Sequence, residues 1–138
     1  MPNSSKRKPR PSVAPYLSVS DAARALDFYQ AAFGAVEMMR WVDPDNGKIG
    51  HAEIRIGERS IFLADEYPET SEIGLHSPLT LGGSSFQFWL TVDDVEAATA
   101  RAVAAGGKLL RPVEQSAQDG RRSRVQDPSG HIWTISSH

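Results

Sequence analysis

"LSVSDAARAL" (Leu17–Leu26) and "LTVDDVEAAT" (Leu90–Thr99) are two versions of one pattern. They share leucine, valine, aspartate and alanine at equal offsets, and Asp94 follows Asp21 by 73 residues. In each version a short alternating run reaches an aspartate that can cap the helix that follows. The repeat therefore predicts two similar supersecondary units, neither of which can bury its apolar face alone.

Three candidate strands follow each predicted helix. The first helix, "AARALDFYQAAF", is closed by Gly34 and is followed by "AVEMMRWV", "KIGHAEIRI" and "SIFLAD", the last two joined as a hairpin by "GERS". The second helix ends at Gly106 and Gly107 and is followed by "KLLRPV", "RRSRVQD" and "HIWTISS". The strands before the helices are "VAPYLSV" and "FQFWLTVDD". Each unit thus reads β-α-β-β-β, which is an α+β pattern.

The length of 138 residues predicts a single domain. We expect a disordered basic tail at residues 1–12, module one at about 13–66, a loop at about 67–84 and module two at about 85–138. The basic tail residues are either simply solvated or in contact with an acidic partner; they are Lys6, Arg7, Lys8 and Arg10. "LGGSS" (Leu81–Ser85) lacks the lysine of a phosphate loop and is interpreted as a hinge between the modules.

Composition excludes several classes of function. The net charge of −2 gives no reason to expect a nucleic-acid partner, and no apolar run is long enough to span a membrane. The absence of cysteine excludes disulfides, a thiol nucleophile and cysteine-based metal sites. Because the N-terminus lacks the apolar core of a signal peptide, we expect a cytoplasmic protein.

Paired units of this size resemble the vicinal oxygen chelate superfamily, which includes glyoxalase I, bleomycin-resistance proteins and extradiol dioxygenases, and within it the PhnB-like, glyoxalase-related branch. The resemblance lies in "PYLSVSDAARALDFYQAAFGA", "HAEIRIGERSIFLADE", "SPLTLGG", "VDDVEAATARAVAAGGKLLRPVE" and "DPSGHIWTISSH". It implies two tandem βαβββ modules whose curved sheets form a shared cleft, with helices on the outer face. It also implies a homodimer, since clefts of this superfamily often form where two chains meet. It implies no particular reaction, because unrelated chemistries share this scaffold.

Many enzymes of this superfamily hold one divalent metal through His, Gln or Glu side chains on the first and last strands of each module. Alignment with the family places Ala14, Phe62, Gln87 and Thr134 at those positions. Alanine and phenylalanine offer no donor, and Gln and Thr offer only weak neutral ones, whereas zinc, iron or nickel needs roughly three or four good donors. The resemblance therefore predicts no metal, and no other cofactor, at the usual site.

Strand alternation assigns side chains either to the cleft or to the helix layer. The side chains predicted to face the cleft are Tyr16, His51, Glu53, Phe62, Gln87, Trp89, Arg122, Arg124 and Thr134. The inward direction of Arg124 follows from the family alignment as well. His131 and Trp133 are predicted to face the helices, and we expect the His131 ring to hydrogen-bond loop backbone rather than to meet a substrate.

The predicted cleft lining suggests a chemistry. Two arginines favour a carboxylate, a phosphate or another planar anion. His51 and Glu53 lie two residues apart on one strand face, so they are either a general acid–base pair or a structural polar cluster that includes Arg55. Phe62 and Trp89 either stack on a flat ligand or simply fill the cleft.

Three hypotheses for function follow. The first is a metal-independent protein that binds a small anionic or aromatic molecule in the cleft. The second is a lyase, isomerase or dioxygenase that acts on a small oxygenated substrate, with His51 and Glu53 as catalytic residues. The third is a protein whose only task is interaction with another protein, and a dimer without an accessible cleft would favour it.

Overall fold

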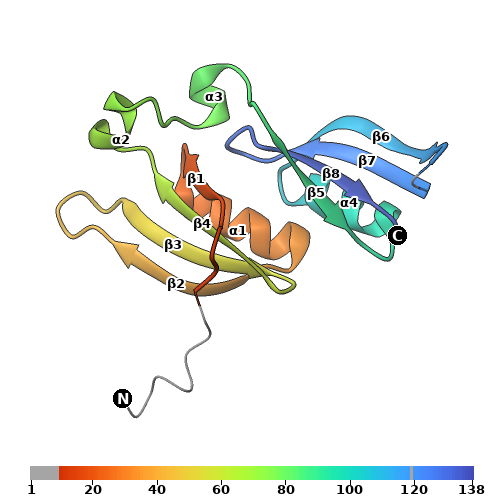
Figure 1. The fold of residues 1–138 in the computed structure, drawn as a ribbon, viewed down its shortest axis with the longest axis horizontal. Coiled ribbons are helices and arrows are strands. Elements are labelled where there is room, and N and C mark those ends of the chain that lie inside the picture. The colour runs from red at the N-terminus through yellow and green to blue at the C-terminus, as the bar shows by residue number, and fades with distance from the viewer. Residues whose placement is uncertain (1–9, 119) are drawn as a thin grey trace, which may run out of the picture.

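The computed structural model of the chain, which describes residues 10–118 and 120–138, contains two four-stranded sheets (Figure 1). The first module consists of β1 (Tyr16–Val19), α1 (Ala22–Phe33), β2 (Val36–Val42), β3 (Ile49–Ile56) and β4 (Arg59–Asp65), with strand order β1-β4-β3-β2. The second consists of β5 (Gln87–Thr91), α4 (Val95–Ala104), β6 (Lys108–Ser116), β7 (Gly120–Gln126) and β8 (Ile132–Ser136), with strand order β5-β8-β7-β6. The predicted α+β fold of two βαβββ modules is confirmed. Most of the predicted basic tail, residues 1–9, lies outside the described residues.

The repeated aspartates cap the two long helices as the sequence predicts. The Asp21 carboxylate accepts a hydrogen bond from the backbone N–H of Arg24, and the Asp94 carboxylate accepts one from the backbone N–H of Ala97. Gly34 ends α1 with a φ of 68°, a left-handed conformation that glycine adopts without strain. The two modules therefore use the same local signals to start the helix directly after the first strand.

The linker between the modules contains more structure than the sequence suggested. The expectation of a loop throughout is wrong, because α2 (Pro68–Glu72) and α3 (Pro78–Leu81) are short helices. Each begins with a proline, whose missing N–H costs nothing in the first turn, and Ser77 caps α3 by accepting from the backbone N–H of Thr80. Among the described residues, no helix is long and apolar enough to cross a membrane.

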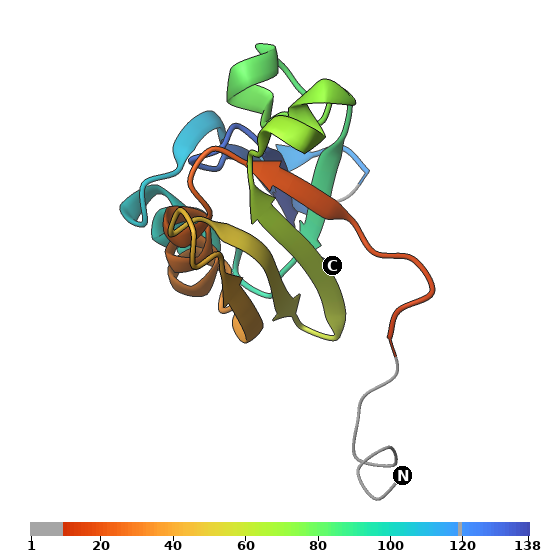
Figure 2. The same cartoon turned by 90° about the vertical axis from the view of Figure 1, so that its left-hand side faces the viewer.

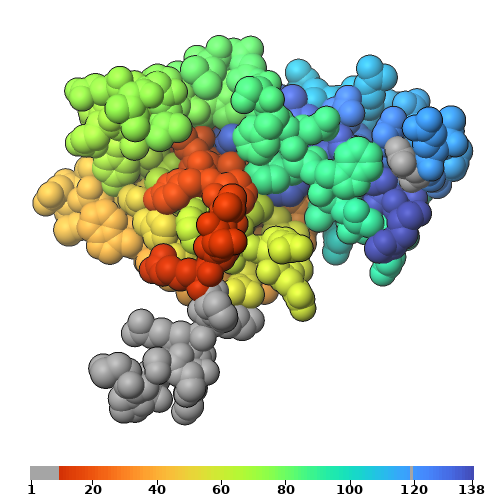
Figure 3. Space-filling model, in the orientation of Figure 1, coloured from red at the N-terminus to blue at the C-terminus, as the bar shows by residue number. Residues whose placement is uncertain are grey.

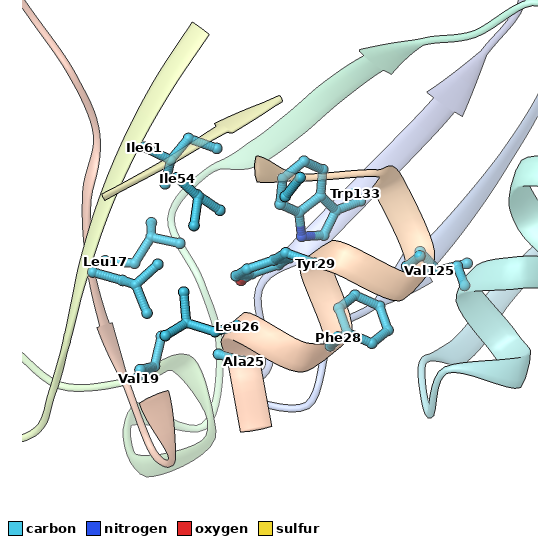
Figure 4. Close-up of a cluster of buried hydrophobic side chains, with 14 of the residues drawn as sticks. Leu17, Val19, Ala25, Leu26, Phe28, Tyr29, Ile54, Ile61, Val125 and Trp133 are labelled. Carbon is cyan, nitrogen blue, oxygen red and sulfur yellow. The ribbon is translucent and has the colours of Figure 1, made fainter. Parts of the chain in front are cut away.

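The core lies between the sheets and the two long helices. In two views at right angles, α1 runs beside α4 (Figures 1 and 2), and the two helices pack together. Leu26 and Tyr29 of α1 are fully buried, and Figure 4 shows Tyr29 between the aliphatic side chains of the first sheet and Trp133 of the second. Trp133 stacks on Phe88 with a centroid distance of 4.2 Å and contacts Phe33 at 4.5 Å. One aromatic cluster thus joins the two modules.

Candidate functional site

The free face of the first sheet carries the candidate residues of module one. Tyr16 pairs with Phe62, and Phe62 pairs with Glu53, so these three side chains form one row across the sheet. His51 is two residues from Glu53 on the same strand and points to the same side. Leu17, Leu63 and the other alternate residues are buried against α1, whereas Tyr16 is 52% exposed. The register therefore brings Tyr16, His51, Glu53 and Phe62 together.

Three of these side chains form a hydrogen-bonded chain. The Tyr16 hydroxyl lies 2.7 Å from His51 Nδ1, and His51 Nε2 lies 3.1 Å from Glu53 Oε1. Burial, and then the charge of Glu53, raise the pKa of Tyr16, so its hydroxyl stays protonated. Because a carboxylate can only accept, we assign the ring proton to His51 Nε2, which donates to Glu53, and Nδ1 then accepts from the Tyr16 hydroxyl. The Phe62 ring packs against both Tyr16 and His51, at centroid distances of 5.9 and 5.4 Å.

The free face of the second sheet carries the candidate residues of module two. Trp89 pairs with Thr134, and Thr134 pairs with Arg124, so these three also form a row. Arg124 Nε donates to Thr134 Oγ1 at 3.1 Å, and that hydroxyl in turn donates to Gln87 Oε1. The Arg122 guanidinium lies over the Trp89 ring, 5.9 Å from its centroid. A cavity of about 290 Å³ opens here, lined by Arg111, Glu114, Arg122, Ser123, Arg124 and Thr134.

The interpretation of His131 needs one correction. Its ring is buried beside Phe86 and Phe88, and among the described residues no group meets full hydrogen-bond geometry at either ring nitrogen; the backbone group that acts on the ring belongs to Ser18 of β1 and not to the loop, so the expected bond to loop backbone is not found. Burial lowers the pKa of His131, an effect opposed by the Asp127 carboxylate and by the backbone of Ser18, which lies close to the ring. The ring is one wall of a cavity of about 310 Å³ between β1 and the linker.

Asp127, which sequence reasoning did not single out, organises the turn instead. Its carboxylate accepts from the backbone N–H groups of Ser129 and His131, each at 3.0 Å. It also accepts from the Tyr29 hydroxyl and, at 3.0 Å, from Trp133 Nε1. Burial raises the pKa of Tyr29 well above its ordinary value, and the nearby Asp127 carboxylate raises it further. An aspartate opening a "DPSG" turn is a signal for such capping, but one of its side-chain partners, Tyr29, lies 98 residues away in the sequence.

The positions of the usual metal ligands do not fit a metal. The side chains of Ala14 and Phe62 have no donor atom, and the carbonyl oxygen of Gln87 already accepts from Thr134. Within residues 10–118 and 120–138, no group of three or more His, Cys, Asp or Glu side chains is arranged to hold a metal ion. The donor set thus offers little to zinc, iron or nickel.

Comparison with known proteins identifies the family. The model of the glyoxalase/bleomycin resistance protein/dioxygenase superfamily matches residues 12–135. The chain belongs to this superfamily. The protein Mb0911c of Mycobacterium bovis is 40% identical over 125 residues, which are 91% of this chain and 82% of that protein. Among solved structures, a glyoxalase-related enzyme from Fulvimarina pelagi is 26% identical with a TM-score of 0.73, over 94% of this chain and 89% of that one.

The PhnB protein of Bacillus cereus shares the fold of this glyoxalase-superfamily chain, with a TM-score of 0.71 at 15% identity over 93% of this chain and 100% of that one. The predicted superfamily is therefore confirmed by the family model, and the PhnB protein shows that the fold is shared. Within the superfamily fold, the predicted site residues form two groups, one on each sheet. Tyr16 lines the cavity beside the linker, and Arg122, Arg124 and Thr134 line the cavity on the second sheet. The roles assigned to these residues remain predictions.

Proposed function

We propose that this superfamily member binds a small anionic or aromatic molecule without the usual metal. The observation that carries the proposal is that Arg122, Arg124 and the half-exposed Trp89 lie on the same free face of the second sheet, with the Arg122 guanidinium over the Trp89 ring. Arg124 hydrogen-bonds a neutral hydroxyl, and among the described residues it has no carboxylate in ion-pairing distance. A guanidinium held in this way can still offer its remaining N–H donors to an anion.

Substitution of Arg124 tests this function directly. Arg124→Ala should weaken the binding of an anionic ligand found in a thermal-shift screen of metabolites and antibiotics by about tenfold to a hundredfold, because a charge-assisted contact contributes roughly 1.5–3 kcal/mol. The melting temperature should change by only a few degrees, since Arg124 is only partly buried. Arg24→Ala, on the exposed side of α1, is the control and should change neither quantity. If the protein unfolds while affinity per folded molecule is unchanged, Arg124 is structural and the proposed anion preference loses its support.

Metal independence is the second part of the proposal. It is supported by the two donor-free positions, Ala14 and Phe62, and by the engagement of Gln87 with Thr134. Elemental analysis of protein purified without chelator should find zinc, nickel, iron and manganese at well below one ion per chain. Near-stoichiometric metal that is lost in Gln87→Ala would contradict this part of the proposal.

A homodimer is the third part. Large apolar side chains remain exposed on the free faces of both sheets, with Trp41 50% and Trp89 52% exposed, and each face carries only some of the candidate residues. A second copy placed over these faces would cover them and complete the cleft. Light scattering at micromolar concentration should give about twice the chain mass of 15.1 kDa. A monomer over that whole range would refute the dimer.

The hydrogen-bonded chain Tyr16–His51–Glu53 favours a second candidate function, an enzyme acting on a small oxygenated substrate. The Tyr16 hydroxyl can accept a substrate hydrogen while it passes its own proton to His51 Nδ1, and Glu53 stabilises the imidazolium that forms, so no free phenolate is needed. Loss of a substrate C–H signal in deuterated water, abolished in Tyr16→Phe, would support this candidate over binding alone. No exchange across a panel of hydroxyketones would leave binding as the better account.

A further inference from the structure

A cavity of about 550 Å³ lies where the two modules meet, and its lining includes none of the arginines of the second sheet. Its walls come from the chain before β1, from the β3–β4 hairpin and from β5, so both modules contribute. Figure 3 shows the chain from residue 10 onward, in red, beside the yellow-green hairpin on this side of the molecule. A volume of this size is typical of small-molecule sites, which span roughly 300–1,000 Å³.

Much of the cavity wall is apolar and aromatic. Val13, Ile61 and Phe88 line it, together with the two tryptophans Trp89 and Trp133. Trp133 is held rigidly by its stacking on Phe88 and by its hydrogen bond to Asp127. Rigid aromatic walls favour a flat apolar ligand body, because little side-chain entropy is lost when the ligand binds.

The polar part of the wall is strongly basic. Arg10, Arg55 and Arg59 line the cavity, against a single lining carboxylate, Glu58. Among the described residues, none of these three guanidiniums takes part in an ion pair or a side-chain hydrogen bond. A surplus of positive charge beside a low-dielectric apolar wall attracts anions.

We propose that this inter-module cavity, which shares Trp89 but no arginine with the site of the proposed function, is a second binding site for an aromatic acid, meaning a flat apolar body that carries a carboxylate or sulfonate. The body packs against Phe88 and Trp89, and the acid group pairs with Arg55 and Arg59 from the hairpin. An inorganic anion would leave the apolar walls in contact with water, so the site favours the acid with its ring attached. This site uses other arginines than the proposed function does.

The test uses two fluorescent probes that differ only in charge. 8-Anilino-1-naphthalenesulfonate carries the acid group, and N-phenyl-1-naphthylamine has the same ring system without it. Arg55→Gln combined with Arg59→Gln should lower the affinity for the sulfonate probe by about tenfold or more and leave the affinity for the neutral probe unchanged. Arg24→Gln combined with Arg101→Gln removes the same charge from the exposed sides of the helices and should change neither affinity. Inorganic phosphate should not displace the sulfonate probe.

Several results would overturn the inference. The first is no binding of the sulfonate probe, and the second is an unchanged affinity in the hairpin variant, which is Arg55→Gln combined with Arg59→Gln. The third is an equal loss of affinity for both probes, which would mean that the variant changes the shape of the cavity and not only its charge. Arg124→Ala separates this site from the proposed function. If Arg124→Ala weakens the sulfonate probe and the hairpin variant does not, the anion binds on the second sheet, which supports the proposed function and refutes this inference. Circular dichroism of each variant verifies that it is folded.

Discussion

Asp127→Ala should lower the free energy of unfolding by about 3–5 kcal/mol, the range for removing one partner of a buried polar network. The carboxylate is 4% exposed and accepts from the side chains of Tyr29 and Trp133 and from the backbone N–H groups of Ser129 and His131. Without it, these donors stay buried and unpaired. Denaturant titration measures the loss, which corresponds to a fall in Tm of about 10 °C or more.

Asp93→Ala provides the matched control for this substitution. The Asp93 side chain is 98% exposed and contacts His138 alone among the described residues, so its removal should cost no more than about 0.5 kcal/mol. A loss below about 1 kcal/mol for Asp127→Ala would show that water replaces the carboxylate and that the turn does not depend on it.

Trp133→Ala should cost about 3–5 kcal/mol, as large aromatic truncations in a packed core do. The indole is 2% exposed and contacts Phe88 of its own module and both Tyr29 and Phe33 of the other, so its loss opens a cavity between the modules. Trp133→Phe keeps a ring but loses the Nε1 donor, and its cost should fall between zero and that of the alanine variant. Both are measured by denaturant titration.

Because Trp133 donates to Asp127, the two alanine substitutions should not be additive. The double variant should lose less than the sum of the single losses, by about 0.5–3 kcal/mol. Additive losses would mean that the tryptophan acts by packing alone and that its bond to Asp127 contributes nothing.

The fold followed from the sequence because its signals are local and occur twice. A capping aspartate, an alanine-rich helix and alternating strands need only a few neighbouring residues to be recognised. The repeat at Asp21 and Asp94 provides each of these signals a second time, which strengthens the prediction. Alternation also assigned Tyr16 and Glu53 to one face and Trp89 and Arg124 to another, since the side-chain period of a strand is two. The short helix α3 was missed because four residues carry no periodicity, although Ser77 and Pro78 together form a helix-start signal.

The contacts within the site could not be predicted in the same way. The bond between Tyr16 and His51 joins residues 35 positions apart, and the bond between Tyr29 and Asp127 joins residues 98 apart. Both depend on the relative placement of strands and helices, which no local pattern contains. The aspartate of the "DPSG" turn was visible in the sequence, but nothing there showed that its carboxylate accepts hydrogen bonds from Trp133 and from the distant Tyr29.

The two helices that meet between the modules have diverged into unequal partners. A shift of 73 residues places Ala102 where α1 has Tyr29, and Gly106 where α1 has Phe33. Beside them, a methyl group on Gly107 would lie 3.2 Å from the Phe28 ring and 2.8 Å from the Ala102 carbonyl oxygen. A large side chain of α1 therefore packs against a position after α4 that has no side chain. The duplicated halves are consequently no longer interchangeable. A chimera built from two copies of the first half should crowd aromatic rings into one space, and one built from two copies of the second should leave that space empty. Both chimeras should therefore be less stable than the natural pair of halves.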